Sequence, residues 1–478
     1  MVFTSFNFLL FFPGLIAVYF LTPIRFRWPV LLIASYFFYI NIKPVFALLL
    51  VYISLVTYLL TRLMEKTEVE SKRKTCLLIN ITLILLPLIF FKYFSVINNY
   101  LINFLAIRDL RWPLPEIKLF LPIGISFYTF TTIGYIVDVY NEEIEVEKNI
   151  GILALFVSFF PLILSGPIER AKNMLPQLKA LNKFDYHMVV QGLKLMLWGY
   201  FMKLVVADRI GIYVDAIYNH IGQHNGKTLL FASVLYPFQV YADLGGYSLI
   251  AIGTARILGI QVMQNFKRPF FATSMSEFWR RWHISLISWL TDYIYTPLSF
   301  AFRKFKVWGI VIALMITFFI SGIWHGAALT FVVWGIMQGV FLSAEALTNK
   351  RKALFEKKHQ LNQKAWYIFL GICFTFILFA ASQIFGRAES LNSALQVYRR
   401  IFTIPGALFI GSPAYLIYSF FGLVMLLFKD FSDEFMPSRF LLFESKHKFI
   451  RVLAYSSIII LILLIGVFDG GQFIYFQF

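Results

Sequence analysis

The chain has 478 residues, of which 59% are hydrophobic and only 14% are charged, and its mean hydropathy is +0.73. A soluble domain carries about 25% charged residues, so this composition excludes an ordinary soluble fold and predicts a polytopic membrane protein. A net charge of +18 would suggest nucleic acid in a soluble protein, but these Lys and Arg residues lie in loops between apolar runs, as the positive-inside rule requires. The two cysteines, Cys76 and Cys373, form neither a disulfide framework nor a metal-binding spacing.

A series of apolar segments runs along the chain, and each is a candidate for one or more membrane helices. Segments 75–107, 228–260 and 307–345 are too long for one straight span, so each is expected to contain two helices, a tilted helix or a span joined to a re-entrant piece. We therefore predict an all-α polytopic membrane protein with about 10 to 13 transmembrane helices plus re-entrant and interfacial helices. The full set of segments is 5–22, 28–41, 44–64, 75–107, 118–139, 149–165, 188–207, 228–260, 307–345, 366–385, 406–428 and 449–468.

The loop charges predict part of the orientation. The basic loops 62–74 and 350–364 are expected in the cytoplasm. The first apolar segment, Phe6 to Leu21, lacks a basic leader, so we interpret it as a span rather than a cleavable signal. Between residues 140 and 270, charge counting does not place all the loops, which re-entrant segments in this stretch would explain.

One histidine lies inside one of the most apolar stretches. His325 is the only titratable side chain from Val307 to Ala344. An imidazole in a bilayer core costs free energy that a leucine would not, so an intramembrane histidine is a candidate functional residue. The alternative is a core histidine that bonds a backbone carbonyl freed by nearby glycines. Small residues, which allow a helix to break or another backbone to approach, surround Trp324 and His325: Ser321, Gly322, Gly326, Ala327 and Ala328.

A second group of residues lies at 274–297, SMSEFWRRWHISLISWLTDYIYTP. Ser274 and Glu277 have the spacing of a capping box at a helix start. Aromatic and aliphatic residues then recur at helical spacing, with Arg280 and Arg281 on another face, which predicts a helix lying at the membrane interface. Pro297 is expected to end this helix.

Two further polar residues have both functional and structural interpretations. His283 follows Trp279 by four residues, so it is expected on the aromatic face, either as a functional group or as a hydrogen-bonded structural histidine. Asp243 precedes Gly245 and Gly246 in an apolar segment. It could cap a broken helix or line a cavity, or it could pair with Arg256 for structure, which we favour.

Four stretches together resemble the membrane-bound O-acyltransferases, and among them the bacterial alginate O-acetylation branch. They are LPIGISFYTFTTIGYIVDVY (121–140), SFFPLILSGPIERAKNMLPQ (158–177), EFWRRWHISLISWLTDYIYTPL (277–298) and SGIWHGAALTFVVWGIMQG (321–339). The last two are the specific ones, and the resemblance extends from near residue 1 to the C-terminal FIYFQF. In place of the family's Tyr-x-Asp-Phe-Ser-Gly-Tyr-Ser-Asp, this chain has YADLGGYSL, which keeps Asp243 and Tyr247 but departs at Leu244, Gly245 and Leu249.

The resemblance implies a single membrane-embedded acyltransferase domain around a central catalytic tunnel. Its parts would be N-terminal spans over 1–110, a catalytic core over about 118–345 and C-terminal spans over 366–478. His325 matches the family's catalytic histidine, and His283 matches the second histidine of the family pair. The expected tunnel lining is Trp324, Ser321, Gly326, Asp243 and Tyr247.

The implied reaction is acyl transfer from a cytoplasmic thioester, acetyl-CoA by expectation, to a hydroxyl. A hydroxyl needs a general base, and burial of His325 would keep its ring neutral and able to accept a proton. Backbone N–H groups near the small residues would stabilise the oxyanion, and His283 would orient the acceptor or polarise the thioester. Arg280 and Arg281, with Trp282, would bind the donor phosphates, or anionic lipid head groups instead. We expect no bound metal and no resident cofactor, because the thioester is a co-substrate.

Three other functions compete with this reading. A transporter or lipid flippase would share the many spans and the buried histidine, and a scaffold subunit would only hold an extracytoplasmic partner. Within the family, a teichoic-acid D-alanyltransferase would use a carrier-protein thioester. For the acetyltransferase, the expected acceptor is an exopolysaccharide such as alginate, reached directly or through an SGNH-like periplasmic or extracellular transferase partner. The expected location is the cytoplasmic (inner) membrane among membrane lipids, with no nucleic-acid partner.

Overall fold

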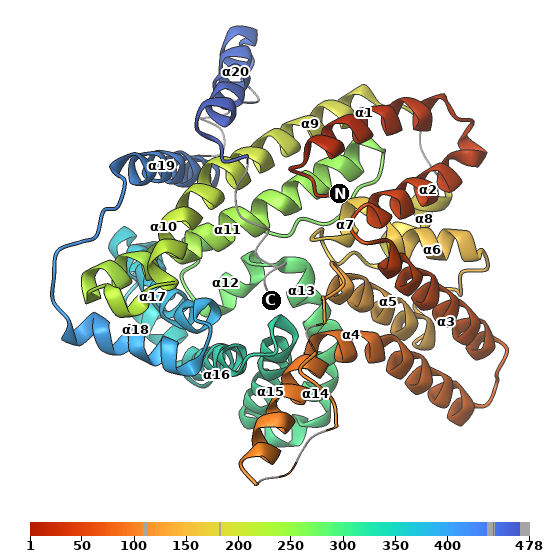
Figure 1. Cartoon of the computed structure of the whole chain (residues 1–478), viewed down its shortest axis with the longest axis horizontal. Helices are drawn as coiled ribbons and strands as arrows, with labels where there is room; N and C mark the ends of the chain where they lie inside the picture. The colour runs from red at the N-terminus through yellow and green to blue at the C-terminus, as the bar shows by residue number, and fades with distance from the viewer. Residues whose placement is uncertain are drawn as a thin grey trace. The chain divides into compact units, whose positions relative to one another are not determined.

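The computed structural model describes residues 1–108, 110, 113–117, 119–180, 183–436, 443 and 445–468. Across these residues the chain is helical and contains no strand (Figure 1). Within the same residues, eight helices are long and apolar enough to cross a membrane, and Phe6–Leu21 and Ile150–Ile163 are shorter apolar helices. The predicted all-α, multi-pass class is confirmed, whereas the larger number of spans and the central tunnel stay predictions. The C-terminal FIYFQF lies outside the described residues.

The chain forms two compact units, the first of which contains Met1–Leu193 and Ala251–Met263. Within it, α2 packs against α1 and α6, and α3 packs against α4, α5 and α6 (Figure 1). Of the predicted basic loop 62–74, only residues 66–69 join α3 to α4, because residues 62–65 end α3 and residues 70–74 begin α4. The helices of this unit are α1 (Phe6–Leu21), α2 (Arg27–Ile40), α3 (Ala47–Glu65), α4 (Glu70–Ala106), α5 (Ile125–Tyr140), α6 (Ile150–Ser158), α7 (Phe160–Ile163) and α8 (Ala171–Lys179), with 3₁₀ turns at Ile24–Phe26 and Pro44–Phe46.

The second unit contains Lys194–Ile250 and Gln264–Phe478. Two helices have residues in both units, α9 (Tyr186–Tyr200) and α11 (Gly226–Ile257). The others are α10 (Asp208–Tyr218), α12 (Met275–Arg281), α13 (Ile284–Leu290), α14 (Thr296–Ala301), α15 (Val307–His325), α16 (Leu329–Lys358), α17 (Ala365–Arg387), α18 (Leu391–Thr403), α19 (Pro413–Phe435) and α20 (Lys448–Ile465). Phe201–Ala207 and Thr291–Tyr295 are π-helical, and 3₁₀ turns lie at Ile221–Gln223, Pro269–Phe271, Arg303–Phe305 and Leu361–Gln363.

The three longest apolar segments differ in how many helices they form. Segments 75–107 and 228–260 each form one continuous helix, α4 and α11. Segment 307–345 divides into α15 and α16, which pack along one another. A Cβ atom on Gly322 would lie 2.5 Å from the carbonyl oxygen of Phe331, so glycine is required for this close approach.

Helices α9 and α11 also meet through glycine. A Cβ on Gly246 would lie 2.8 Å from the carbonyl oxygen of Gly199. The pair Gly245–Gly246 therefore allows close helix contact and does not break α11, contrary to one of our sequence interpretations.

The π-helical segment Phe201–Ala207 continues α9 into α10 and also joins the second unit's last helix. A π-helix shifts the backbone hydrogen-bond ladder by one residue and so frees carbonyl groups. The carbonyl of Leu204 accepts from the N–H of Val467 at 3.0 Å, and Arg209 Nε donates to the carbonyl of Ile465 at 2.6 Å. These two bonds attach the C-terminal end of α20 to the π-helical segment and to the first turn of α10.

The stretch 274–297 differs from the single interfacial helix that its periodicity predicts. Half of the predicted capping box is present, because the Ser274 hydroxyl accepts from the N–H of Glu277 at 3.2 Å. The Glu277 carboxylate accepts from the N–H of Thr273 at 2.8 Å, one residue before the position that a capping box uses. The helix then breaks at His283, between α12 and α13, and the chain remains helical past Pro297 to Ala301. Pro297 therefore does not end the helix as predicted. It directly follows the π-helical segment Thr291–Tyr295, where the ladder of backbone hydrogen bonds is already displaced.

Candidate active site

His283 lies at a left-handed backbone position between α12 and α13. Its φ and ψ are 47° and 50°, a region that costs a non-glycine residue free energy and that is frequent at functional sites. The side chain is buried, with 2% relative exposure, and burial lowers the pKa of His283 from 6.5 to about 3. The ring is therefore neutral over the physiological pH range.

His325 is the last residue of α15, so the helix break that the small residues predict comes directly after it. Its ring is half-buried and lies 4.8 Å from the ring of Trp324 and 4.8 Å from the ring of Trp334, at interplanar angles of 75° and 81°. Two nearly perpendicular indoles thus fix the imidazole. The C-terminal end of a helix carries partial negative charge, which stabilises an imidazolium formed there on proton uptake.

Trp324 connects the two histidines. Its ring centroid lies 6.3 Å from that of His283 and 4.8 Å from that of His325. The structure therefore brings together the two residues that the sequence predicts as a pair, from a helix break and from a helix end.

Among the small residues predicted around His325, Ala327 and Ala328 are partly exposed. Ser321 and Gly326 are both buried, and a Cβ on Gly326 would lie 2.2 Å from the Phe331 ring. Glycine at position 326 is thus explained by ring packing, and a tunnel-lining role for these residues stays a prediction.

Two tryptophans near this pair were missed as site residues. Trp334 contacts His325, and the rings of Trp334 and Trp279 lie 5.9 Å apart. Both indole N–H groups are buried, with no hydrogen-bond partner among the described residues. The sequence offered one indication for Trp334. It lies in the second half of segment 307–345, and once that segment divides into two helices, α16 packs along α15 and brings Trp334 to His325.

The two predicted donor-binding arginines differ in environment. Arg280 is exposed, whereas Arg281 donates to Glu277 at 2.6 Å and to Glu434 of α19 at 2.9 Å. Burial lowers the pKa of the Arg281 guanidinium, but the hydrogen bonds and charges of the two carboxylates outweigh it and raise the pKa. Burial of Glu277 raises the pKa of its carboxyl group. The hydrogen bonds from Thr273 and the charge of Arg281 outweigh burial, so the pKa of Glu277 is lowered.

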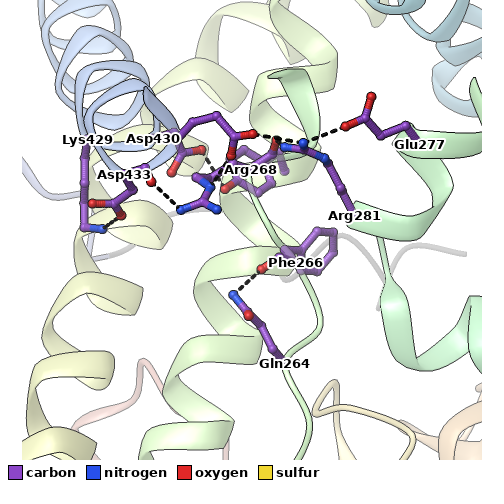
Figure 2. Close-up of polar contacts among 10 residues, drawn as sticks. Gln264, Phe266, Arg268, Glu277, Arg281, Lys429, Asp430 and Asp433 are labelled. Atoms are coloured by element: carbon purple, nitrogen blue, oxygen red, sulfur yellow. Dashed lines mark hydrogen bonds and ion pairs between the residues drawn. The ribbon is translucent and has the colours of Figure 1, made fainter. Parts of the chain in front are cut away.

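Figure 2 shows that the network continues to Arg268 and α19. Arg268 pairs through Nε with Glu434 at 2.7 Å and donates through Nη1 to the carbonyl of Asp433 at 2.8 Å. The hydroxyl of Tyr241 donates to Asp430 at 2.8 Å. Arg281 is thus part of a balanced ion-pair network that joins α12 and α19. Sequence reasoning missed Glu434, because a charged run at a helix end is ordinarily a solvated surface.

Trp282, the third predicted donor-binding residue, is buried in an aromatic cluster. Its ring lies 5.0 Å from Phe379, 5.2 Å from Phe266 and 5.4 Å from Phe278. These contacts make Trp282 part of the packed interior, and its role toward a donor stays a prediction.

Asp243 belongs to a buried charge cluster that the sequence interpretation assigned incorrectly. Its carboxylate lies 2.7 Å from Lys203 Nζ, which also lies 2.7 Å from Asp208. Arg256, the predicted partner, instead donates to Gln191 at 3.2 Å. Lys203 Nζ also lies 5.7 Å from the ring centroid of Tyr247. Asp243 and Tyr247 therefore share a cation, and Lys203 is the residue that sequence reasoning missed.

Comparison with known proteins follows the same motifs. A model of MBOAT, the membrane-bound O-acyltransferase family, matches residues 148–387. The chain is 32% identical over 447 residues to the probable alginate O-acetylase of Pseudomonas aeruginosa, an alignment that covers 88% of this chain and 82% of that protein. It is 31% identical over 406 residues to the peptidoglycan O-acetyltransferase of Helicobacter pylori, covering 79% and 74%. It is 29% identical over 265 residues to the teichoic acid D-alanyltransferase of Bacillus subtilis, covering 53% and 65%.

The matched range contains both histidines and the Lys203 cluster. The eight apolar helices are those of a multi-pass membrane protein. The resemblance inferred from four stretches of sequence is thereby confirmed, and the chain belongs to the membrane-bound O-acyltransferase family.

Proposed function

We propose that the protein takes an acetyl group from a cytoplasmic thioester, acetyl-CoA, and passes it across the inner membrane toward hydroxyl groups of an exopolysaccharide, either through an extracytoplasmic transferase or directly. The observation that supports this proposal most is that the rings of His283 and His325 both lie near the same indole, that of Trp324. A hydroxyl acceptor needs a general base. A histidine at a helix end and a second, neutral histidine near the same indole supply a base and an orienting group.

His325 acts as the base in this scheme. As the acceptor oxygen attacks the thioester carbonyl carbon, its proton moves to the imidazole of His325. The carbonyl is restored when the carbon–sulfur bond breaks, and the departing thiolate accepts that proton from His325, which returns the imidazole to its neutral form. The partial negative charge at the end of α15 stabilises the transient imidazolium.

His283 has a different part in the scheme. Because burial lowers the pKa of His283 to about 3, its ring stays neutral and hydrogen-bonds the acceptor or the thioester carbonyl without competing for the proton.

The acceptor class is inferred from the relatives. Proteins similar to this chain are named as alginate and peptidoglycan O-acetylating enzymes and as a teichoic acid D-alanyltransferase. The longer matches are to the acetylating enzymes, which favours acetyl over D-alanyl transfer. We propose that the acetyl group reaches the polymer through an SGNH-like extracytoplasmic transferase, and direct transfer is the second route.

A turnover assay with labelled acetyl-CoA and purified protein tests the assignment. His325→Ala should lower turnover about 100-fold or more, in the range of general-base catalysis. His359→Ala, an exposed histidine after α16, is the matched control and should keep wild-type turnover. Wild-type turnover in His325→Ala would refute the base assignment.

Three further measurements distinguish the other functions: substrate transport, polymer acetylation in cells and turnover with a different thioester. A transporter would move substrate with no thioester turnover, and a scaffold would keep polymer acetylation in cells that carry both His283→Ala and His325→Ala. Turnover with a carrier-protein thioester in place of acetyl-CoA would favour D-alanyl transfer.

A further inference from the structure

A short segment before α12 runs alongside the chain that carries His283. We define the strap as residues Gln264–Arg268. The N–H of Lys267 donates to the carbonyl of Arg281 at 2.8 Å, and the N–H of Ile284 donates to the carbonyl of Asn265 at 2.8 Å. The two backbone bonds lie on either side of His283, so the strap holds the chain two residues before and one residue after the left-handed residue.

Asn265 contributes its side chain as well. It is buried, with 3% relative exposure, and its Oδ1 accepts from the N–H of Ser285 at 3.2 Å and from the hydroxyl of Ser285 at 2.9 Å. The first N–H groups of a helix need acceptors from outside the helix, and α13 begins at Ile284. His283 is the N-cap residue of α13, and imidazole is not among the side chains that cap helices well. Asn265 therefore caps α13 from a distant segment, with both its main-chain and its side-chain oxygen.

The strap also places an aromatic ring next to the imidazole of His283. The ring of Phe266 lies 6.0 Å from the ring of His283, and the ring of Trp324 lies 6.3 Å from it. Residues 265 and 266 thus fix the backbone and one neighbour of the same ring.

The far end of the strap is anchored. Arg268 also has left-handed backbone, with φ of 45°, and is joined to Glu434 and Asp433 of α19. Arg281 donates to the carbonyl of Arg268 at 3.4 Å. Figure 2 shows these contacts around Arg268 and Arg281. A strap anchored at this end holds Asn265 in place, so its two oxygens can define the position of His283.

We propose that Asn265 is the positioning residue for His283 in acyl transfer. The inference depends on the proposed function, because it gives Asn265 an effect on turnover only through His283. A left-handed histidine is costly on its own, and the strap contacts hold the chain in that conformation. Without the Asn265 oxygens, α13 can extend backward or fray, and either change rotates the imidazole away from Trp324 and His325.

Asn265→Ala should lower acetyl-CoA turnover about 10- to 100-fold, since displacement of a reacting group by about 1 Å costs a factor of that order. Asn265→Asp keeps an acceptor oxygen at the same atom and places a negative charge at a helix start, so it should recover most of the loss.

The matched control is Asn149→Ala. Asn149 Oδ1 also accepts from two N–H groups at a helix start, those of Gly151 at 2.9 Å and Ile152 at 3.3 Å, but it caps α6 in the first unit. Asn149→Ala should lower the thermal midpoint and leave the turnover of the folded protein unchanged.

A double-mutant cycle distinguishes positioning from general stabilisation. If Asn265 acts through His283, adding Asn265→Ala to His283→Ala should change turnover by less than about twofold, because effects within one unit are not additive. Full multiplication of the two losses would overturn the proposal. Should Asn265→Ala fail to yield folded protein, Ser285→Ala, which removes the hydroxyl that donates to Asn265 Oδ1, carries the same cycle.

The single variants separate the two ideas. A large loss in His283→Ala with wild-type turnover in Asn265→Ala would overturn the positioning role alone. Wild-type turnover in His283→Ala would overturn the proposed function of His283, and with it the positioning role.

Discussion

Replacing Lys203 by methionine should destabilise the protein strongly. Lys203 lies in the π-helical segment with its Nζ at 2.7 Å from both Asp208 and Asp243, and all three side chains are buried. Methionine has a similar length and no charge, so the change removes the cation from between two carboxylates and leaves the volume almost unchanged. Removing one partner of a buried ion pair costs about 3 to 5 kcal/mol, because the remaining charge is left in a low dielectric.

That loss is a large part of a typical stability of about 5 to 15 kcal/mol. Unfolding by SDS in mixed micelles measures this loss of stability as a shift in the SDS mole fraction at which half of the protein is unfolded. Lys227→Met, at an exposed lysine near the start of α11, is the control and should shift the midpoint little. Adding Asp208→Asn and Asp243→Asn to Lys203→Met removes the uncompensated charges and should restore at least half of the loss.

Two results would refute this reasoning. If the free energy of unfolding of Lys203→Met lay within about 1 kcal/mol of the wild-type value, the ion pairs would contribute little. A triple variant less stable than Lys203→Met would show that the cluster acts through hydrogen bonding and shape rather than through charge.

The remaining predictions concern pH and donor binding. Because burial lowers the pKa of His283 to about 3, below its ordinary 6.5, the unfolded chain binds a proton that the folded chain does not, so stability should fall as the pH decreases from about 6.5 toward 3. His283→Asn should flatten this part of a plot of unfolding midpoint against pH, and an unchanged slope would contradict the assignment. Arg280→Ala should raise the KM for acetyl-CoA about tenfold at constant kcat, as loss of a charge-assisted contact does, and an unchanged KM would leave lipid head groups as its partner. Arg281→Ala should instead lower stability, since it removes the contacts to Glu277 and Glu434.

Hydrophobic patterning predicted most of the fold. Segment 366–385 became α17 at Ala365–Arg387, and segment 307–345 divided into α15 and α16 next to Gly326, as the small residues there suggested. These features depend on local composition, which a sequence displays directly. The motifs that contain His283 and His325 also predicted them as a pair, and the structure has both rings near Trp324. Their catalytic roles stay predictions.

What the sequence did not show depends on contacts between distant residues. Nothing in WRRWHIS, which contains neither glycine nor proline, predicts a break at His283, because the break is held by Asn265 and Lys267. Arg281 and Glu434 are separated by 153 positions, and no local pattern links them. Arg256 was preferred as the partner of Asp243 because it lies in the same apolar segment, whereas Lys203 lies on another helix.

The attachment of α20 to the π-helical segment affects how topology can be mapped experimentally. Reporter enzymes are commonly joined to progressively shortened chains, and every shortening before Ile465 would remove the groups that bind Leu204 and Arg209. Such chains would lose two hydrogen bonds of the second unit, so the orientation that they report is not evidence for that of the intact protein. Tags inserted into loops of the full-length chain, or labelling of single cysteines from either side of the membrane, avoid this error.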